Sequence, residues 1–354
     1  MSQYQMDKDA EMAFLASQLD ALGEGDGSVD PREMQEQQWV DETAQALELM
    51  SATEHEIAQQ FQRASDGEPL EVEQLDLAVT RMSGSLAEDP DALIGLSLLR
   101  QHDHEGFDHS VNVSIYLMAM ARGMGVDEES VNAIGLGGLL HDLGKSQISP
   151  AVMNKKEKLS ESDCKVIRNH VDATLEMMEV MEVSDLSRKL AAEHHERLDG
   201  SGYPKKLKGD EISQVGRMGA ICDMFDAMTS NRIYRKAREG KEVLRHLLKE
   251  GKESKRLDSK MVEIFIRSVG IYPIGSIVRM ADTRMGVVIR NSRADLLRPV
   301  VRVVAKGDEQ LNPYTLDLSK NPESAAQRIV GTETPSVVRI NPTLFMPAAE
   351  LYHV

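Results

Sequence analysis

The sequence predicts a mainly α-helical protein with a small β-rich region at its C-terminus. Apolar residues recur at helical spacing through most of residues 31–270, which is typical of amphipathic and buried helices. Short runs rich in valine and isoleucine follow Gly270 and indicate strands. The regular alternation of strand and helix that builds a parallel sheet is missing from this pattern. We therefore expect three parts: an acidic helical region over 1–90, a helical domain over 91–270 and a small β-rich domain over 271–354.

The N-terminal region is predicted to be helical and interrupted by turns. Residues 1–30 are polar and end in a glycine-rich run, which indicates a short helix followed by a flexible linker. Residues 31–65 carry spaced apolar side chains and predict an amphipathic helix that Asp66-Gly67-Glu68-Pro69 ends. A further helix is expected over 71–85, and Asp89-Pro90 precedes the next one.

The pattern of the middle domain is helical almost throughout. Residues 110–122 are mostly apolar and predict a buried helix. The apolar, glycine-rich run 131–143 predicts close packing around His141. Ser160-Glu161-Ser162-Asp163 has the chemistry of a helix N-cap, and another apolar helix is expected over 213–230.

Three β-prone runs predict the strands of the C-terminal domain. They cover residues 277–280, 286–289 and 299–304. The first two lie on either side of the turn-like run 281–284. A small β-rich domain is therefore expected after the last helix.

The composition excludes several classes of protein. No apolar run reaches eighteen residues, so we expect no membrane insertion. The N-terminus lacks the basic and apolar regions of a signal peptide. The two cysteines, Cys164 and Cys222, form no disulfide framework and suit a reducing compartment. We therefore expect a cytoplasmic protein.

The negative charge is concentrated at one end of the chain. The formal net charge is −17, and residues 1–100 hold 22 acidic and 5 basic side chains. The remaining residues carry equal numbers of acidic and basic side chains, so this part of the chain is able to hold an anionic substrate. The acidic part is a poor partner for a nucleic-acid polymer or an anionic membrane surface. A solvated helical surface is the simplest explanation of its charge.

Histidines concentrate in one part of the chain. Seven of the ten lie between His102 and His195, although a single buried histidine is more often a core residue than a ligand. Neutral imidazoles and carboxylates are ligands of zinc, iron and manganese. Neighbouring residues on a helix point about 100° apart, so an adjacent pair reaches one cluster best from a helix end. For His194-His195, the following Gly-Ser-Gly-Tyr-Pro run is expected to supply that end. The metal-site interpretation rests on a combination: His109, His141-Asp142, His170, His194-His195 and Asp223.

The order of these residues resembles the HD-GYP family of metal-dependent phosphodiesterases, a branch of the HD superfamily. The resemblance covers residues 95–270, and Ile271-Tyr272-Pro273-Ile274-Gly275 is also similar to the family. Its most specific part is the stretch from His194-His195-Glu196 to Gly202-Tyr203-Pro204. The resemblance implies an HD-type helical bundle that hydrolyses cyclic di-GMP. The matching segments are His109–Val113, His141–Lys145, His170, His194–Pro204 and Asp223–Ser230, with Arg232, Tyr234 and Arg235 beyond.

The resemblance also implies a set of metal ligands. Members with three metals carry a glutamate four residues before the first histidine, and Glu105 has that position here, one helical turn from His109. The alternative is a solvated glutamate in the charged run that includes His102 and His104, which we interpret as surface residues. The resemblance favours the three-metal subgroup, with two or three divalent ions, iron or manganese. The implied ligands besides Glu105 are His109, His141, Asp142, His170, His194, His195 and Asp223.

Basic residues near the motifs are expected to hold the substrate. Lys145 lies three residues beyond Asp142 and is expected to contact a phosphate or the metal-bound water. Arg232 and Arg235 lie three residues apart and suit phosphate oxygens, with surface salt bridges as the alternative.

Other motif residues are expected to shape the site. Asp226 is expected to orient a metal ligand or an arginine. Gly202, Tyr203 and Pro204 either shape their loop or contact a partner protein. Cys222 adjoins Asp223 on a helix, so it should point elsewhere and pack in the core.

The expected reaction is two-metal hydrolysis of a phosphodiester. Asp142 is expected to bridge the metals, and a bridging hydroxide to attack phosphorus and release the 3′ oxygen, which gives pGpG. A third metal at Glu105 would favour further hydrolysis to GMP. Two alternatives stay open: a noncatalytic cyclic di-GMP receptor and an HD-type hydrolase of another cyclic dinucleotide. Residues 1–90 are expected to be regulatory, forming a homodimer or contacting signalling proteins, or else to cap the bundle.

Overall fold

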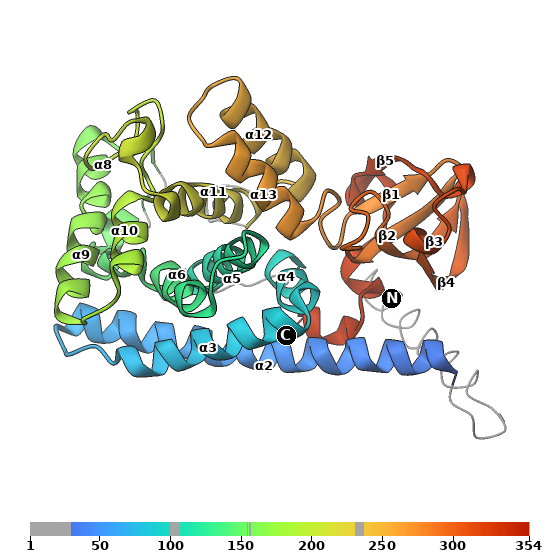
Figure 1. Cartoon of the computed structure of the whole chain (residues 1–354), viewed down its shortest axis with the longest axis horizontal. Helices are drawn as coiled ribbons and strands as arrows, with labels where there is room; N and C mark the ends of the chain where they lie inside the picture. The colour runs from blue at the N-terminus through green and yellow to red at the C-terminus, as the bar shows by residue number, and fades with distance from the viewer. Residues whose placement is uncertain (1–29, 100–106, 154, 156, 231–236, 354) are drawn as a thin grey trace. The chain divides into compact units, whose positions relative to one another are not determined.

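Helices form the described chain up to Gly270, and strands follow it in the computed structural model (Figure 1). The structure describes residues 30–99, 107–153, 155, 157–230 and 237–353. The short helix and linker predicted over 1–30 lie, up to residue 29, outside the described residues. The chain divides into units of residues 1–39 and 40–354. No described helix combines the length and apolar character that a membrane crossing requires.

The predicted helices are present, with boundaries shifted by a few residues. Ser160 caps its helix with a capping box: its Oγ accepts from Asp163 N (3.2 Å), and Asp163 Oδ2 accepts from Ser160 N (2.8 Å). The helices before the sheet are α2 (Pro31–Asp66), α3 (Val72–Glu88), α4 (Pro90–Leu99), α5 (Phe107–Gly123), α6 (Glu128–Leu140), η1 (Leu143–Gln147), α7 (Pro150–Met153), α8 (Glu161–Arg168), α9 (His170–Val180), α10 (Asp185–Glu193), η2 (Gly209–Glu211), α11 (Gln214–Thr229), α12 (Gly240–Lys252) and α13 (Ser259–Val269).

Helix α5 is the centre of the helical bundle. Every residue from Ser110 to Ala121 is buried, because α5 packs against α4, α6, α11 and α13. Tyr116 packs edge to face on Phe225 and Phe265, with ring centroids 5.3 and 6.1 Å away. This packing fixes the first turn of α5, which carries His109.

Helix α2 is amphipathic, as predicted. Its buried side chains follow one another at alternating steps of three and four residues, which places them on one stripe of the helix. At the turn into α3, Gln60 Oε1 accepts from Glu71 N (2.8 Å). That the N-terminal helices form a homodimer stays a prediction. The stripe comprises Thr43, Ala46, Met50, Thr53, Ile57, Gln60 and Ala64.

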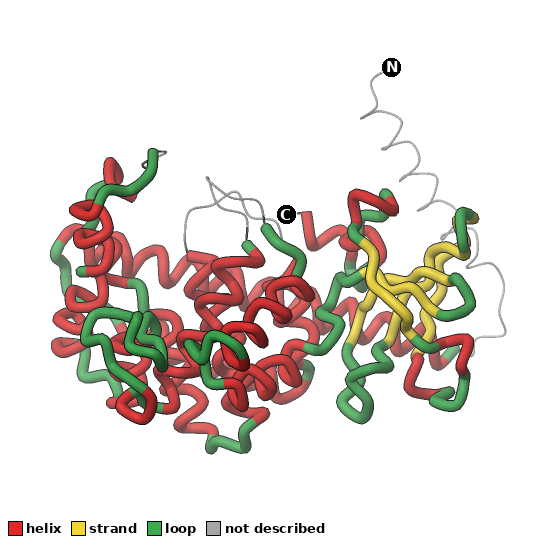
Figure 2. The backbone as a smooth tube through the Cα atoms, turned by 90° about the horizontal axis from the view of Figure 1, so that it is seen from above, coloured by secondary structure: helices red, strands yellow, loops and turns green. Residues whose placement is uncertain are grey.

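The C-terminal region forms one antiparallel sheet in the order β4-β3-β2-β1-β5, drawn in yellow in Figure 2. The three predicted β-prone runs lie in β1, β2 and β3, and their valines fill its core. The sequence did not indicate β4 or β5, because β4 is mostly exposed, β5 is short and half-buried, and neither edge strand carries an apolar run. The strands are β1 (Ile277–Met280), β2 (Arg284–Arg290), β3 (Val300–Lys306), β4 (Glu309–Asp317) and β5 (Ile329–Glu333). The short helices η3 (Leu318–Lys320), η4 (Ala325–Gln327), α14 (Pro335–Val338), η5 (Pro342–Phe345) and η6 (Ala349–His353) lie in the same region.

A polar network joins the sheet to the bundle. The Arg290 guanidinium at the end of β2 donates to both carboxylate oxygens of Asp89, each at 2.7 Å. Asn291 donates from its backbone N (2.9 Å) and its amide (3.1 Å) to Asp91, at the start of α4. Burial raises the pKa of Asp91 to about 6, although the hydrogen bonds from Asn291 oppose this shift.

Candidate metal centre

The first predicted pair, His141-Asp142, follows the last residue of α6 and leads into η1. Gly138 allows α6 to approach α5, since a Cβ there would lie 2.8 Å from Ser114 Cα. Gly144 allows η1 to approach α9, since a Cβ there would lie 2.2 Å from the His170 carbonyl oxygen. The two glycines therefore permit the packing that brings Asp142 next to the start of α9.

The second pair lies where α10 ends. The helix stops at Glu193, and His194 is its C-cap residue. We predicted that the Gly-Ser-Gly-Tyr-Pro run would end this helix, but the helix ends before that run, at the histidines themselves. The backbone turns there because Glu196 N donates to the Glu193 carbonyl oxygen (2.8 Å). As expected of a helix end, both imidazoles reach one cluster.

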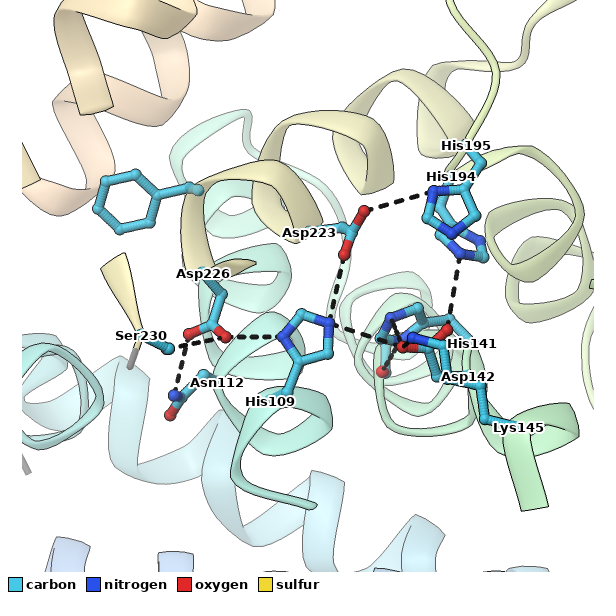
Figure 3. A network of polar contacts seen from close by, with 12 residues as sticks. His109, Asn112, His141, Asp142, Lys145, His194, His195, Asp223, Asp226 and Ser230 are labelled. Atoms are coloured by element: carbon cyan, nitrogen blue, oxygen red, sulfur yellow. Dashed lines mark hydrogen bonds and ion pairs between the residues drawn. The ribbon is translucent and has the colours of Figure 1, made fainter. Parts of the chain in front are cut away.

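Seven of the eight predicted ligands converge in one largely buried cluster, and Figure 3 labels all of these seven except His170. The carboxylate of Asp142 is its centre, with one oxygen 3.2 Å from His141 Nε2 and the other 3.2 Å from His170 Nε2. Asp223, from α11, lies 3.2 Å from His109 Nε2 and 3.5 Å from His195 Nδ1. Residues from five helices or helix ends thus share one small volume.

Three of the histidines are fixed in the same tautomer. His141, His170 and His194 each place Nδ1 at 2.6–2.8 Å from the carbonyl oxygen three residues earlier. A carbonyl oxygen only accepts hydrogen bonds, so each Nδ1 must carry the proton and each Nε2 offers a lone pair. The helical backbone therefore prepares three metal-ligating atoms.

The unsatisfied atoms of the cluster fit a metal. Nε2 of His141, His170 and His194, with one oxygen of Asp142, is buried without a hydrogen-bond partner, which is costly unless a cation is bound. Two groups of ligand atoms, each with all members within 4.8 Å of one another, share the Asp142 carboxylate. The arrangement therefore suits two neighbouring divalent cations. One group comprises Asp142, His170, His194 and His195, and the other His109, His141 and Asp142.

The protonation states of the cluster also suit cation binding. Burial lowers the pKa of His195 to about 3 and that of His194 well below its usual range, so both imidazoles are neutral at pH 7. His109 is the exception: burial opposes its charge, but hydrogen bonds with Asp223 and Asp226 outweigh burial and raise its pKa to about 9, so a cation would have to displace a proton from this imidazole. Burial likewise opposes charge on Asp142, yet His141 and Lys145 hold its pKa well below its usual range. Negative carboxylates beside neutral imidazoles attract a divalent ion.

A second layer of residues holds His109. Asp226, which is fully buried, accepts from His109 Nδ1 at 2.6 Å, and its role in orienting this candidate ligand stays a prediction. Asn112 Nδ2 (3.0 Å) and Ser230 Oγ (3.2 Å) donate to the same carboxylate (Figure 3). Sequence reasoning gave no role to Asn112 or Ser230. Asn112 was detectable in principle, because a residue three positions after His109 lies on the same helix face.

The Gly-Tyr-Pro loop is held by a buried glutamate. Glu196 accepts hydrogen bonds from the backbone N–H groups of Lys205 (2.7 Å) and Leu207 (3.0 Å). The loop brings the Tyr203 ring to 4.6 Å from the His195 ring, centroid to centroid. Tyr203 therefore borders the cluster, and Gly202 and Pro204 flank it in the loop. The motif includes Glu196, but the sequence did not indicate this anchoring role.

The predicted substrate-binding residues are only partly within the described chain. Lys145 Nζ forms a close ion pair with Asp142, and its side chain is 26% exposed. Glu105, Arg232 and Arg235 lie outside the described residues. Cys222 is buried, as expected of a packing residue.

Comparison with known proteins identifies the family of the chain. A family model described as HD domain matches residues 93–261. The cyclic di-GMP phosphodiesterase PA4108 of Pseudomonas aeruginosa is 33% identical over 296 residues, which are 83% of this chain and 70% of that protein. The chain belongs to the HD-domain family of cyclic di-GMP phosphodiesterases. The resemblance predicted from the motifs is confirmed, together with the mainly helical fold.

Other relatives of this HD-domain protein share shorter regions. The 3′3′-cGAMP-specific phosphodiesterase 1 of Vibrio cholerae is 33% identical over 162 residues, 46% of this chain and 37% of that protein. The HD-domain protein thus spans well under half the length of that relative. The solved structure of Bd1817, an HDG"Y"P protein from Bdellovibrio bacteriovorus, matches with a TM-score of 0.51 and 14% identity over 73% of this chain and 79% of that chain. That likeness supports the fold alone.

Proposed function

We propose that this protein hydrolyses cyclic di-GMP to linear pGpG at a centre of two or more divalent cations. The observation that carries the proposal is the shared carboxylate: Asp142 belongs to both groups of buried ligand atoms. The cations would be held by His109, His141, Asp142, His170, His194, His195 and Asp223. Divalent ions at such a site supply Lewis-acid activation of water and stabilise the charge of a phosphodiester.

The remaining residues bind and orient. Lys145 lies beside Asp142 with a partly exposed side chain, so it can neutralise a phosphate oxygen at the edge of the cluster. Arg232 and Arg235 are proposed to bind phosphate as well. Asp226 keeps the Nδ1 proton on His109 and so directs Nε2 into the centre.

The donor set favours iron or manganese. It consists of imidazoles and carboxylates, which suit hard and borderline ions. Cys222 adds no thiolate, because burial raises the pKa of its thiol well above the usual range. We propose a third ion at Glu105, which predicts about three metals per chain and continued hydrolysis to GMP; Glu105→Gln should then bind about one ion fewer.

The direct test combines metal analysis with chromatography of products. Protein loaded with Mn²⁺ or Fe²⁺ should convert cyclic di-GMP to pGpG, and His141→Ala and Asp142→Ala should abolish turnover. His55→Ala is the matched control, because His55 is exposed on α2 outside the cluster. Fully metal-loaded wild-type protein that binds cyclic di-GMP without turnover would instead indicate a receptor.

A second candidate substrate is 3′3′-cGAMP. The specific observation in its favour is the similarity to phosphodiesterases of Vibrio cholerae named for that substrate. Parallel assays with both cyclic dinucleotides at equal concentration decide between them through the ratio of kcat/KM. A ratio that favours 3′3′-cGAMP would replace the cyclic di-GMP assignment.

A further inference from the structure

An arginine contacts the metal cluster through the Gly-Tyr-Pro loop. The Arg168 guanidinium carbon lies over the Tyr203 ring, 5.0 Å from its centroid. The Tyr203 ring also lies 4.6 Å from the His195 ring, centroid to centroid, with a 34° angle between the ring planes. Arg168, Tyr203 and His195 therefore form one connected row that starts at a candidate metal ligand.

The charge of Arg168 is available to a ligand. Arg168 is an exposed residue in the last turn of α8, and the residues that the structure describes include no carboxylate within ion-pair distance of it. Its neighbours in the region differ, because Lys155 pairs with Asp163 (2.5 Å) and Lys145 pairs with Asp142. The negative end of the α8 dipole attracts the Arg168 side chain, but this attraction does not occupy the N–H donors of its guanidinium.

The same end of α8 borders an open pocket next to the cluster. The pocket has a volume of about 300 Å³ and lies between η1 and the α8–α9 segment. Lys165, one turn before Arg168, lines it together with Asn169 and the candidate ligand His170. Lys165 thus lies at the pocket, and Arg168, one turn further along α8, lies over the Tyr203 ring at the edge of the metal cluster.

A cyclic dinucleotide needs such a group. Its two phosphates lie on opposite sides of one ring, so the phosphate that does not react carries a negative charge away from the cluster and from Lys145. A guanidinium that rests on an aromatic ring uses its face for that contact and keeps its edge N–H groups for phosphate oxygens. The Tyr203 ring also restricts the arginine to one place, which reduces the entropy lost on binding.

We propose that Arg168, oriented by Tyr203, binds the second, non-reacting phosphate of the cyclic dinucleotide, and that Lys165 adds positive charge beside it. This inference rests on the proposed function. It gives the Tyr203 of the Gly-Tyr-Pro motif a defined role as a positioning residue for substrate recognition.

The test compares substrates with two phosphates and with one. Arg168→Ala should raise KM for cyclic di-GMP about tenfold or more, the usual loss for a charged hydrogen bond, with little change in kcat. It should leave kcat/KM for bis(p-nitrophenyl) phosphate, which has no second phosphate, unchanged. Titration calorimetry with the bisphosphorothioate analogue of cyclic di-GMP should show the same loss of affinity. Tyr203→Phe should retain wild-type KM, whereas Tyr203→Leu should raise it.

The matched control is Arg267→Ala, which removes an exposed arginine from the last turn of α13. It should leave kcat/KM unchanged for both substrates, and the metal content of all variants should equal that of wild type. An equal loss with both substrates would overturn the inference, because Arg168 would then support the metal centre itself. Unchanged KM for cyclic di-GMP in Arg168→Ala would overturn it as well. Wild-type protein that cleaves only the single-phosphate substrate would reject the proposed function instead.

Discussion

Replacing Asp226 by asparagine tests how the protein prepares His109 for a cation. The carboxylate accepts from His109 Nδ1 at 2.6 Å through one oxygen and from Asn112 at 3.0 Å through the other. If the new amide turns its NH₂ toward His109, Nδ1 must accept and the ring proton moves to Nε2, where it blocks the metal. If the amide turns its oxygen toward His109, the negative charge that strengthens the imidazole as a ligand is lost. Both orientations weaken cation binding.

The expected loss is about 10- to 100-fold in metal affinity, which is the usual effect of removing a partner of a metal-ligating histidine. Competition of Mn²⁺ between the protein and a chromophoric chelator measures it directly, and hydrolysis of cyclic di-GMP should fall in parallel. Ser230→Ala is the control, because it removes only the 3.2 Å bond to the same carboxylate and should bind Mn²⁺ almost normally. The reasoning is refuted if Asp226→Asn binds Mn²⁺ as tightly as wild type while its thermal unfolding is unchanged.

Three further changes test the supports of the site. Gly144→Ala should lower the free energy of unfolding, measured in urea, by about 3 kcal/mol, because its Cβ would lie 2.2 Å from the His170 carbonyl oxygen. Gly84→Ala is the control: its Cβ would enter open space on a helix, so it should raise this free energy by about 0.5–1 kcal/mol. Equal effects of the two substitutions would contradict the packing argument. Glu196→Ala should leave two loop N–H groups without acceptors and cost about 1–3 kcal/mol, seen as faster proteolysis of the loop, and an unchanged cleavage rate would count against the anchor. Because burial raises the pKa of Asp91 to about 6, the folded protein binds a proton that the unfolded chain has released, so Asp91 favours folding less as the pH rises from 5 to 8. The free energy of unfolding of Asp91→Asn, measured in urea, should therefore rise by about 1 kcal/mol relative to that of wild type between pH 5 and pH 8. A difference between the two proteins that stays constant over this range would disprove the shift.

Much of the fold could be predicted because its signals are local. Helical periodicity, the Ser160 cap and the breaks at Gly67 and Asp89-Pro90 act within a few residues, and the structure has helices with nearly these limits. The β4 and β5 strands could not be predicted, because edge strands owe their conformation to the partner strand rather than to their own apolar pattern. The end of α10 was also predicted too late, since its helix already stops at Glu193.

The candidate site shows the same division. Of the eight predicted ligands, Glu105 lies outside the described residues, and the structure brings the other seven together, although their roles as ligands stay proposals. Asn112, Glu196 and Arg168 were given no role, because their partners lie 9 to 114 positions away in the sequence. Such partners are fixed by packing and leave no local pattern.

The sequence by itself determined the chemistry of this protein: which imidazoles and carboxylates are present, their spacing, and the family to which they belong. It also determined that Nδ1 of His141, His170 and His194 carries a proton. Each of these residues follows a helical turn, and the carbonyl oxygen that accepts from Nδ1 belongs to the residue three positions earlier. Only the tertiary structure decided that one carboxylate, Asp142, serves two groups of ligands, and that Arg168 reaches the cluster through Tyr203. The physical reason is distance along the chain: helix geometry fixes neighbours within one turn, whereas contacts between helices depend on how closely glycines such as Gly138 and Gly144 let those helices pack.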